Sequence, residues 1–164
     1  MCSEAASGIT VVLGIGNLLR QDEGVGVHVA QRLLEADLPE GVEVLDGGTA
    51  PTVALDAVGP IGRLIVVDAV DAGAEPGTVF RLRPHQVETK SPVLSLHELP
   101  ALELFAWARN SQLTPERIEI VAVQPRSMDW GTELSPPVAA AAERVVQLLM
   151  TELGRAVLTE GEPG

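Results

Sequence analysis

Apolar residues in this chain form short strand-like segments that alternate with helically spaced ones. Four segments have the short, apolar pattern of buried parallel strands: Thr10–Ile15, Val42–Leu45, Leu64–Val67 and Arg117–Val123. Four others have the apolar spacing of helices: Glu23–Glu35, Pro51–Val58, Leu99–Arg109 and Pro136–Leu153. This alternation predicts an α/β fold, a three-layer α/β/α sandwich around a mostly parallel sheet.

One segment departs from this pattern. Thr78–Arg83 alternates apolar and charged residues, which is typical of a strand exposed on one side and predicts an edge or antiparallel strand. The segment after it, Pro84–Pro92, is polar and predicts a long loop. We expect a single domain over residues 1–154, followed by a disordered C-terminal tail over residues 155–164.

The composition fits a sheet that is covered on both faces. The chain has 164 residues, of which 46% are hydrophobic but only 2% aromatic, so the core must be aliphatic. The formal net charge of -12 argues against binding to a nucleic-acid backbone or an anionic membrane surface. The same charge is compatible with a metal cation or a basic peptide as a ligand.

The cysteine content and the N-terminus bear on the cellular compartment. Cys2 is the only cysteine, so no internal disulfide can form. The first residues lack the basic start of a signal peptide, and no apolar run is long enough to span a bilayer. We therefore expect a cytoplasmic protein.

The junction between the first strand and the first helix holds the most informative motif. Over Leu13–Val27 a glycine-containing turn leads into the acidic pair Asp22 and Glu23 at the expected start of a helix. A P-loop would need Gly-Lys-Ser/Thr here, and a dinucleotide fingerprint would need a glycine where Leu19 stands. Two interpretations stay open. The acidic pair serves chemistry at the carboxyl edge of the sheet, or it only caps and charges the first helical turn.

Four side chains from distant parts of the chain are expected at that edge. Glu23 follows the first strand, Asp46 and Asp68 end the second and third strands, and His97 precedes a later helix. Two carboxylates and an imidazole can bind a borderline divalent ion and leave positions open for other ligands. Each residue also has an ordinary role, since strand-end aspartates often cap turns and a lone histidine is usually structural.

The pattern Gly14-x-Gly16-Asn17-x-Leu19-x-x-Asp22-Glu23-Gly24-x-Gly26 resembles the opening motif of the hydrogenase maturation proteases. The similarity continues in the same order through four further segments, Leu45–Thr49, Leu64–Ala69, Ser95–Leu99 and Leu134–Pro136. These endopeptidases trim the C-terminal tail of the nickel-iron hydrogenase large subunit. The resemblance implies a five-stranded sheet with one antiparallel strand, which Thr78–Arg83 would supply.

The resemblance also implies roles for individual residues. Glu23, Asp68 and His97 stand where the family has metal-contacting residues. Nickel is expected to arrive with the substrate rather than as a resident cofactor, and no organic cofactor is expected. Asp46 is either a catalytic general base or a residue that orients its loop. The two remaining histidines match no family position and are interpreted as structural or solvated; they are His28 and His85.

The partner implied by the resemblance is the large-subunit precursor of a nickel-iron hydrogenase. We expect the acidic crevice and the loop Pro84–Pro92 to dock its basic C-terminal segment, and we expect a monomer. Two other classes stay open: a non-catalytic metal-binding or chaperone module for hydrogenase assembly, and a flavodoxin-like nucleotide-binding domain. A cleavage assay separates the first from a protease, and the acidic loop weighs against the second. The sequence contains neither Gly-x-Ser-x-Gly nor His-Glu-x-x-His, so serine-elbow and zinc-helix mechanisms lack support.

Overall fold

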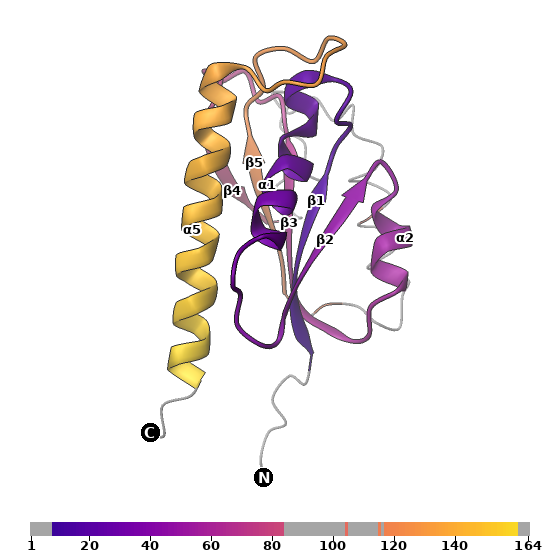
Figure 1. The fold of residues 1–164 in the computed structure, drawn as a ribbon, viewed down its shortest axis with the longest axis vertical. Helices are drawn as coiled ribbons and strands as arrows, with labels where there is room; N and C mark the ends of the chain where they lie inside the picture. Colours follow the sequence, from indigo (N-terminus) through magenta and orange to yellow (C-terminus); the bar gives the residue numbers. More distant parts are fainter. Residues whose placement is uncertain (1–7, 84–103, 105–114, 116, 161–164) are drawn as a thin grey trace.

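A five-stranded sheet runs through the centre of the protein (Figure 1). The computed structural model describes residues 8–83, 104, 115 and 117–160, with side chains in the last helix described up to residue 154. The strands are β1 (Ile9–Ile15), β2 (Val42–Gly48), β3 (Ile61–Ala69), β4 (Val79–Leu82) and β5 (Arg117–Val123). Their order is β2-β1-β3-β5-β4, and β4 alone is antiparallel to its neighbour. The predicted sheet, including its antiparallel strand, is confirmed.

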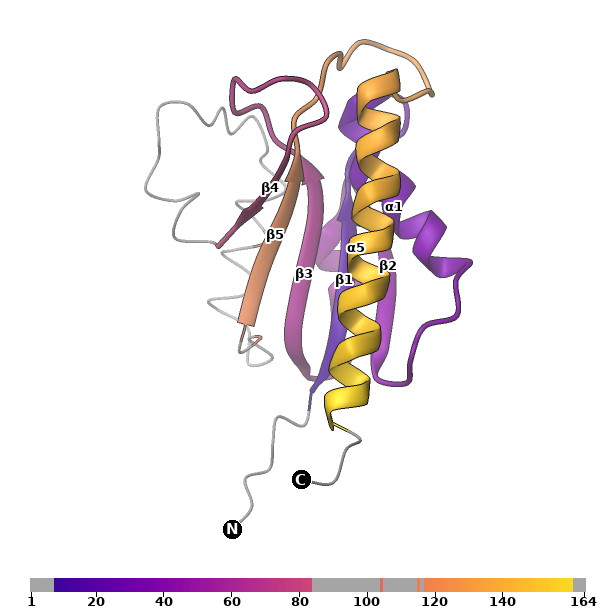
Figure 2. The same cartoon turned by 90° about the vertical axis from the view of Figure 1, so that its left-hand side faces the viewer.

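Helices cover both faces of the sheet. They are the 3-10 helix η1 (Gln21–Gly24), α1 (Val25–Leu34), α2 (Pro51–Asp56) and α5 (Pro136–Glu160). Figure 2 shows α1 and α5 together on one face, whereas α2 packs on the other. None of the described helices is both long enough and apolar enough to cross a bilayer.

Each face of the sheet has its own hydrophobic cluster. Successive side chains of a strand point to opposite faces, so Val12 joins the cluster beneath α1 and α5. Its neighbour Val11 joins the cluster around Leu55 of α2. Leu104 is also buried in this second cluster. Among the described residues, the buried members of both clusters are aliphatic, as the low aromatic content of the sequence predicts.

At the carboxyl edge of the sheet, the ends of two strands and the start of one helix differ from the predicted ones. β2 continues through Gly48 rather than ending at Leu45, because Asp46 and Gly48 still pair with β1. β3 runs to Ala69, so Asp68 lies inside the strand rather than just beyond it. The predicted helix Glu23–Glu35 is divided into η1 and α1.

The last helix is longer than predicted. α5 extends to Glu160, past the predicted end at Leu153, because the residues after Gly154 are mostly good helix formers. The predicted loop Pro84–Pro92 lies outside the described residues. So does the predicted helix Leu99–Arg109, except that Leu104 is helical and fully buried.

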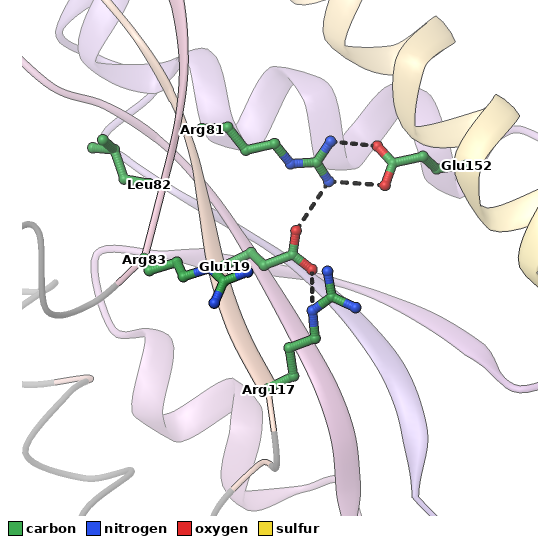
Figure 3. Close-up of a pocket in the computed structure, with 6 residues that line it drawn as sticks. All are labelled: Arg81, Leu82, Arg83, Arg117, Glu119 and Glu152. Atoms are coloured by element: carbon green, nitrogen blue, oxygen red, sulfur yellow. Dashed lines mark hydrogen bonds and ion pairs between the residues drawn. The ribbon is translucent and has the colours of Figure 1, made fainter.

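A network of arginines and glutamates lies beneath the C-terminal half of α5 (Figure 3). Glu119 of β5 is buried and accepts a hydrogen bond of 2.8 Å from Arg63 of β3. Arg117 and Arg81 of β4 lie 3.2 and 3.1 Å from the same carboxylate. Arg81 also donates to both oxygens of Glu152 on α5. The network therefore ties α5 to three strands, next to a pocket of about 350 Å³ at the amino end of β5.

Acid is expected to weaken the attachment of α5 to the sheet. The hydrogen bonds from Arg81 lower the pKa of Glu152 below its ordinary 4.5. Because the folded-state pKa is the lower one, this carboxylate contributes stability that is present above the unfolded-state pKa. The contribution is lost as the pH falls through the folded-state pKa.

Glu152→Gln should lower the free energy of unfolding by about 1 kcal/mol at pH 7, an amount expected for a partly exposed ion pair. At pH 3 the variant and the wild type should differ less, because this pH lies below the ordinary 4.5 and part of the stabilisation by the charged carboxylate is then lost. Urea unfolding at both pH values measures this. Glu143→Gln, which breaks the exposed pair with Arg32, is the matched control and should change stability less. An identical pH dependence of Glu152→Gln and wild type would show that the charge of Glu152 contributes nothing to stability.

Candidate active site at the carboxyl edge of the sheet

Two glycines allow α1 to begin against the ends of β1 and β3. A Cβ atom on Gly26 would lie 2.0 Å from the carbonyl oxygen of Val67, a distance that no side chain tolerates. A Cβ atom on Gly14 would lie 2.1 Å from the carbonyl oxygen of Gly26. These glycines of the motif therefore serve close helix–strand packing, which accounts for them without a bound nucleotide.

Glu23 lies at the edge that this packing creates. It belongs to η1, which leads directly into α1 and contacts β3. Its side chain is 25% exposed, and its carboxylate Oε2 lies 3.6 Å from Nε of Arg20. Glu23 is therefore accessible at the carboxyl edge of the sheet, as predicted.

Asp68 reaches the same edge from β3, the neighbour of β1. It is only 3% exposed, and its Oδ1 accepts a hydrogen bond of 2.8 Å from the backbone N–H of Ala69. Ala122 of β5 is its partner across the sheet. The fold thus brings Asp68 and Glu23, which are distant in sequence, to one end of two adjacent strands.

Asp46 lies at the carboxyl end of β2 and is exposed. Its Oδ1 accepts a hydrogen bond of 3.1 Å from the backbone N–H of Gly48, whose φ is +49°. This bond holds the turn after the strand, which agrees with the interpretation that Asp46 orients its loop. Its role as a general base stays a prediction.

The histidines complete the account of the candidate residues. His97 and His85 lie outside the described residues, so the predicted three-residue metal site stays a prediction. Within the part of the chain that the structure describes, no three His, Cys, Asp or Glu side chains gather closely enough to hold a metal. His28 is half-buried on α1, and burial lowers its pKa, which favours the neutral imidazole.

Asp22 has a role that the sequence interpretation missed. It is fully buried and accepts hydrogen bonds from the backbone N–H groups of Arg126 (2.9 Å) and Ser127 (3.0 Å). It also accepts hydrogen bonds of 2.7 Å from both the backbone N–H and the hydroxyl of Ser135. Asp22 therefore joins η1 to the segment that connects β5 with α5.

This environment decides the charge state of Asp22. Burial raises its pKa, but the bonds from Ser135, Ser127 and Arg126 outweigh burial and leave the pKa below its ordinary 3.8. α1 has no side-chain cap, so the interpretation of Asp22 as a helix cap is wrong. The one sequence signal for its true partner was the block Leu134–Pro136, which contains Ser135.

Comparison with known families and relatives gives a consistent result. The family described as hydrogenase maturation protease matches residues 27–152, more than half of the chain. The hydrogenase expression/formation protein HupD of Rhizobium leguminosarum bv. viciae is 38% identical over 147 residues, covering 85% of this chain and 73% of HupD. The hydrogenase 2 maturation protease of Escherichia coli K12 is 32% identical over 146 residues, covering 87% of this chain and 89% of that protein.

Solved structures show the same fold. The hydrogenase maturating endopeptidase HybD from Escherichia coli superimposes with a TM-score of 0.76 at 32% identity, covering 90% of this chain and 93% of HybD. The maturation protease HycI from Thermococcus kodakarensis KOD1 gives a TM-score of 0.76 at 29% identity, covering 92% and 95% of the two chains.

Proposed function

Because this chain belongs to the hydrogenase maturation protease family, we propose that it is an endopeptidase that removes the C-terminal extension of a nickel-iron hydrogenase large-subunit precursor after nickel insertion. The observation that carries the proposal is the placement of two acidic residues at one edge of the sheet, Asp68 near the end of β3 and Glu23 in η1 after the neighbouring strand β1. Close glycine packing sets the start of α1 beside them. The carboxyl ends of parallel strands are where open α/β sheets bind ligands.

Nickel enters this proposal as part of the substrate. Glu23 and Asp68 supply carboxylate oxygens, which hold nickel less firmly than thiolates or imidazoles do. A nickel ion already held by the ligands of the precursor needs only weak additional contacts, and His97 is proposed as the third of them. Bound in this way, the ion would place the scissile bond against the edge of the sheet and polarise it.

The remaining catalytic role falls to a carboxylate that can accept a proton. Asp46 is exposed at the end of β2, and its Oδ1 is oriented by the N–H of Gly48. We propose that it accepts a proton from the attacking water, which makes hydrolysis a carboxylate-dependent reaction of the aspartyl type. The cytoplasmic location and the monomeric state stay predictions from the sequence.

Asp68→Asn tests the function and the metal contact together. The substitution keeps an oxygen that can accept from the N–H of Ala69, so folding should be spared. It removes the negative charge facing the nickel, and cleavage should fall by about 100-fold, because metal positioning and polarisation are worth several kcal/mol. Nickel-loaded precursor is incubated with the variant, and loss of the tail is followed by mass spectrometry.

Asp37→Asn is the matched control, because Asp37 is an exposed aspartate in the loop between α1 and β2. This variant should cleave as the wild type does. Wild-type protein that binds the precursor without cutting it would instead identify a non-catalytic assembly module. Equal cleavage by wild type and Asp68→Asn would remove Asp68 from the site while leaving the protease assignment in place.

A further inference from the structure

Two large apolar side chains are exposed at the same edge of the sheet as Glu23. Trp130 is 75% exposed and belongs to the segment between β5 and α5, which crosses the end of α1 in Figure 1. Leu19 is 58% exposed and belongs to the turn between β1 and η1. Other exposed large hydrophobic residues, Leu34, Val53 and Leu148, lie on three separate helices. Single exposed residues of that kind are ordinary, whereas two on adjoining loops are not.

The two loops are held together by backbone hydrogen bonds. Gly131 donates its N–H to the carbonyl of Leu19 at 2.9 Å and accepts from the N–H of Gln21 at 2.8 Å. Gln21 is the one described non-glycine residue with a positive φ, at 44°. The structure therefore presents Leu19 and Trp130 on a fixed frame, which lowers the entropy that is lost when a partner binds.

Arg20 connects this frame to the candidate active site. Its guanidinium carbon lies 5.5 Å from the centre of the Trp130 ring, and its Nε donates to the carbonyl of Met128 at 3.1 Å. The same Nε lies 3.6 Å from Oε2 of Glu23. Arg20 thus contacts both the exposed tryptophan and the carboxylate, so a single side chain separates Trp130 from Glu23.

We propose that Leu19 and Trp130 form a docking platform for the large-subunit precursor, binding apolar side chains next to the bond that is cut. This inference rests on the proposed function and names a substrate-recognition surface for it. Tryptophans that become buried at the centre of an interface carry much of the binding energy, and here the exposed ring lies next to Arg20, which also contacts Glu23. The platform binds the precursor, and the carboxylates at the carboxyl edge of the sheet then take part in cleavage of the peptide bond.

Fluorine NMR tests the docking directly. The chain contains two tryptophans, so labelling with 5-fluorotryptophan should give two ¹⁹F signals, and Trp130→Phe assigns the one that disappears. Addition of unlabelled nickel-loaded precursor should shift or broaden the Trp130 signal. A Trp130 signal that stays unchanged at precursor concentrations where cleavage is saturated would overturn the proposal.

Cleavage kinetics provide the second test. Trp130→Ala should lower kcat/KM by about 30-fold, the size of an interface hot spot, while kcat changes by less than about twofold. Leu148→Ala, which shortens an exposed leucine on α5, is the control and should leave both constants unchanged. A kcat/KM of Trp130→Ala within about twofold of the wild-type value would refute the platform even though the wild type cleaves. Wild type that fails to cleave would refute the proposed function instead, and the NMR titration would still decide whether the precursor docks.

Discussion

Precursor that lacks nickel should survive incubation with this protein intact, whereas nickel-loaded precursor should lose its C-terminal tail. The described part of the edge offers Glu23 and Asp68 as ligands, and the only cysteine in the sequence is Cys2. Two carboxylates alone do not supply the complete set of protein ligands that would hold a catalytic nickel tightly. Under the proposed function the ion comes with the substrate, where it would convert weak binding into correct positioning.

The expected difference between the two precursors is large. Holding the reacting groups in the correct orientation lowers the activation barrier by far more than a single contact does. We therefore expect the initial cleavage rate of nickel-loaded precursor to exceed that of nickel-free precursor by at least about 100-fold. A mass-spectrometric time course of both precursor forms measures it, with Asp37→Asn as a variant that should respond like wild type. Equal cleavage of both forms would show that nickel does not gate the reaction, and the endopeptidase assignment would be unaffected.

Asp22→Asn should lower the free energy of unfolding by about 3 kcal/mol. The substitution removes a buried negative charge that accepts several hydrogen bonds, and hydrogen bonds to a charged group are the stronger ones. The amide that takes its place can accept at only one of the two oxygen positions, so at least one donor among Arg126, Ser127 and Ser135 loses its partner. Urea unfolding at pH 7 measures the change. Ser135→Ala, which removes only the hydroxyl bond, should cost about 1 kcal/mol.

The effect of Asp22→Asn should also depend on pH in a defined direction. The folded-state pKa of Asp22 lies below the ordinary 3.8, so the carboxylate stabilises the protein above that value and loses its effect in stronger acid. The variant and the wild type should therefore converge as the pH falls. Glu23→Gln is the neighbouring control and should reduce cleavage with little loss of stability. A stability loss for Asp22→Asn no larger than that for Ser135→Ala would show that the backbone bonds to Asp22 contribute little.

Much of the fold could be predicted because its signals are local. Strand β5 has the predicted bounds, Arg117–Val123, since a run of apolar residues that is buried on both faces has a clear pattern of its own. The alternation in Thr78–Arg83 likewise identified the antiparallel edge strand β4. Parallel strands place their carboxyl ends at one edge, and this rule predicted that Glu23 and Asp68 would lie at the same edge of the sheet.

What only the tertiary structure decided concerns partners that are far apart in the chain. The sequence by itself determined the fold class, the family resemblance and the edge that bears the carboxylates. It did not reveal that Asp22 accepts hydrogen bonds from Ser135, or that Leu19 accepts one from Gly131, the residue after Trp130. Periodicity and turn chemistry describe neighbours along the chain, whereas these contacts depend on how two loops meet across the end of a sheet. A buried carboxylate and an exposed tryptophan therefore acquire their roles only when the chain has folded.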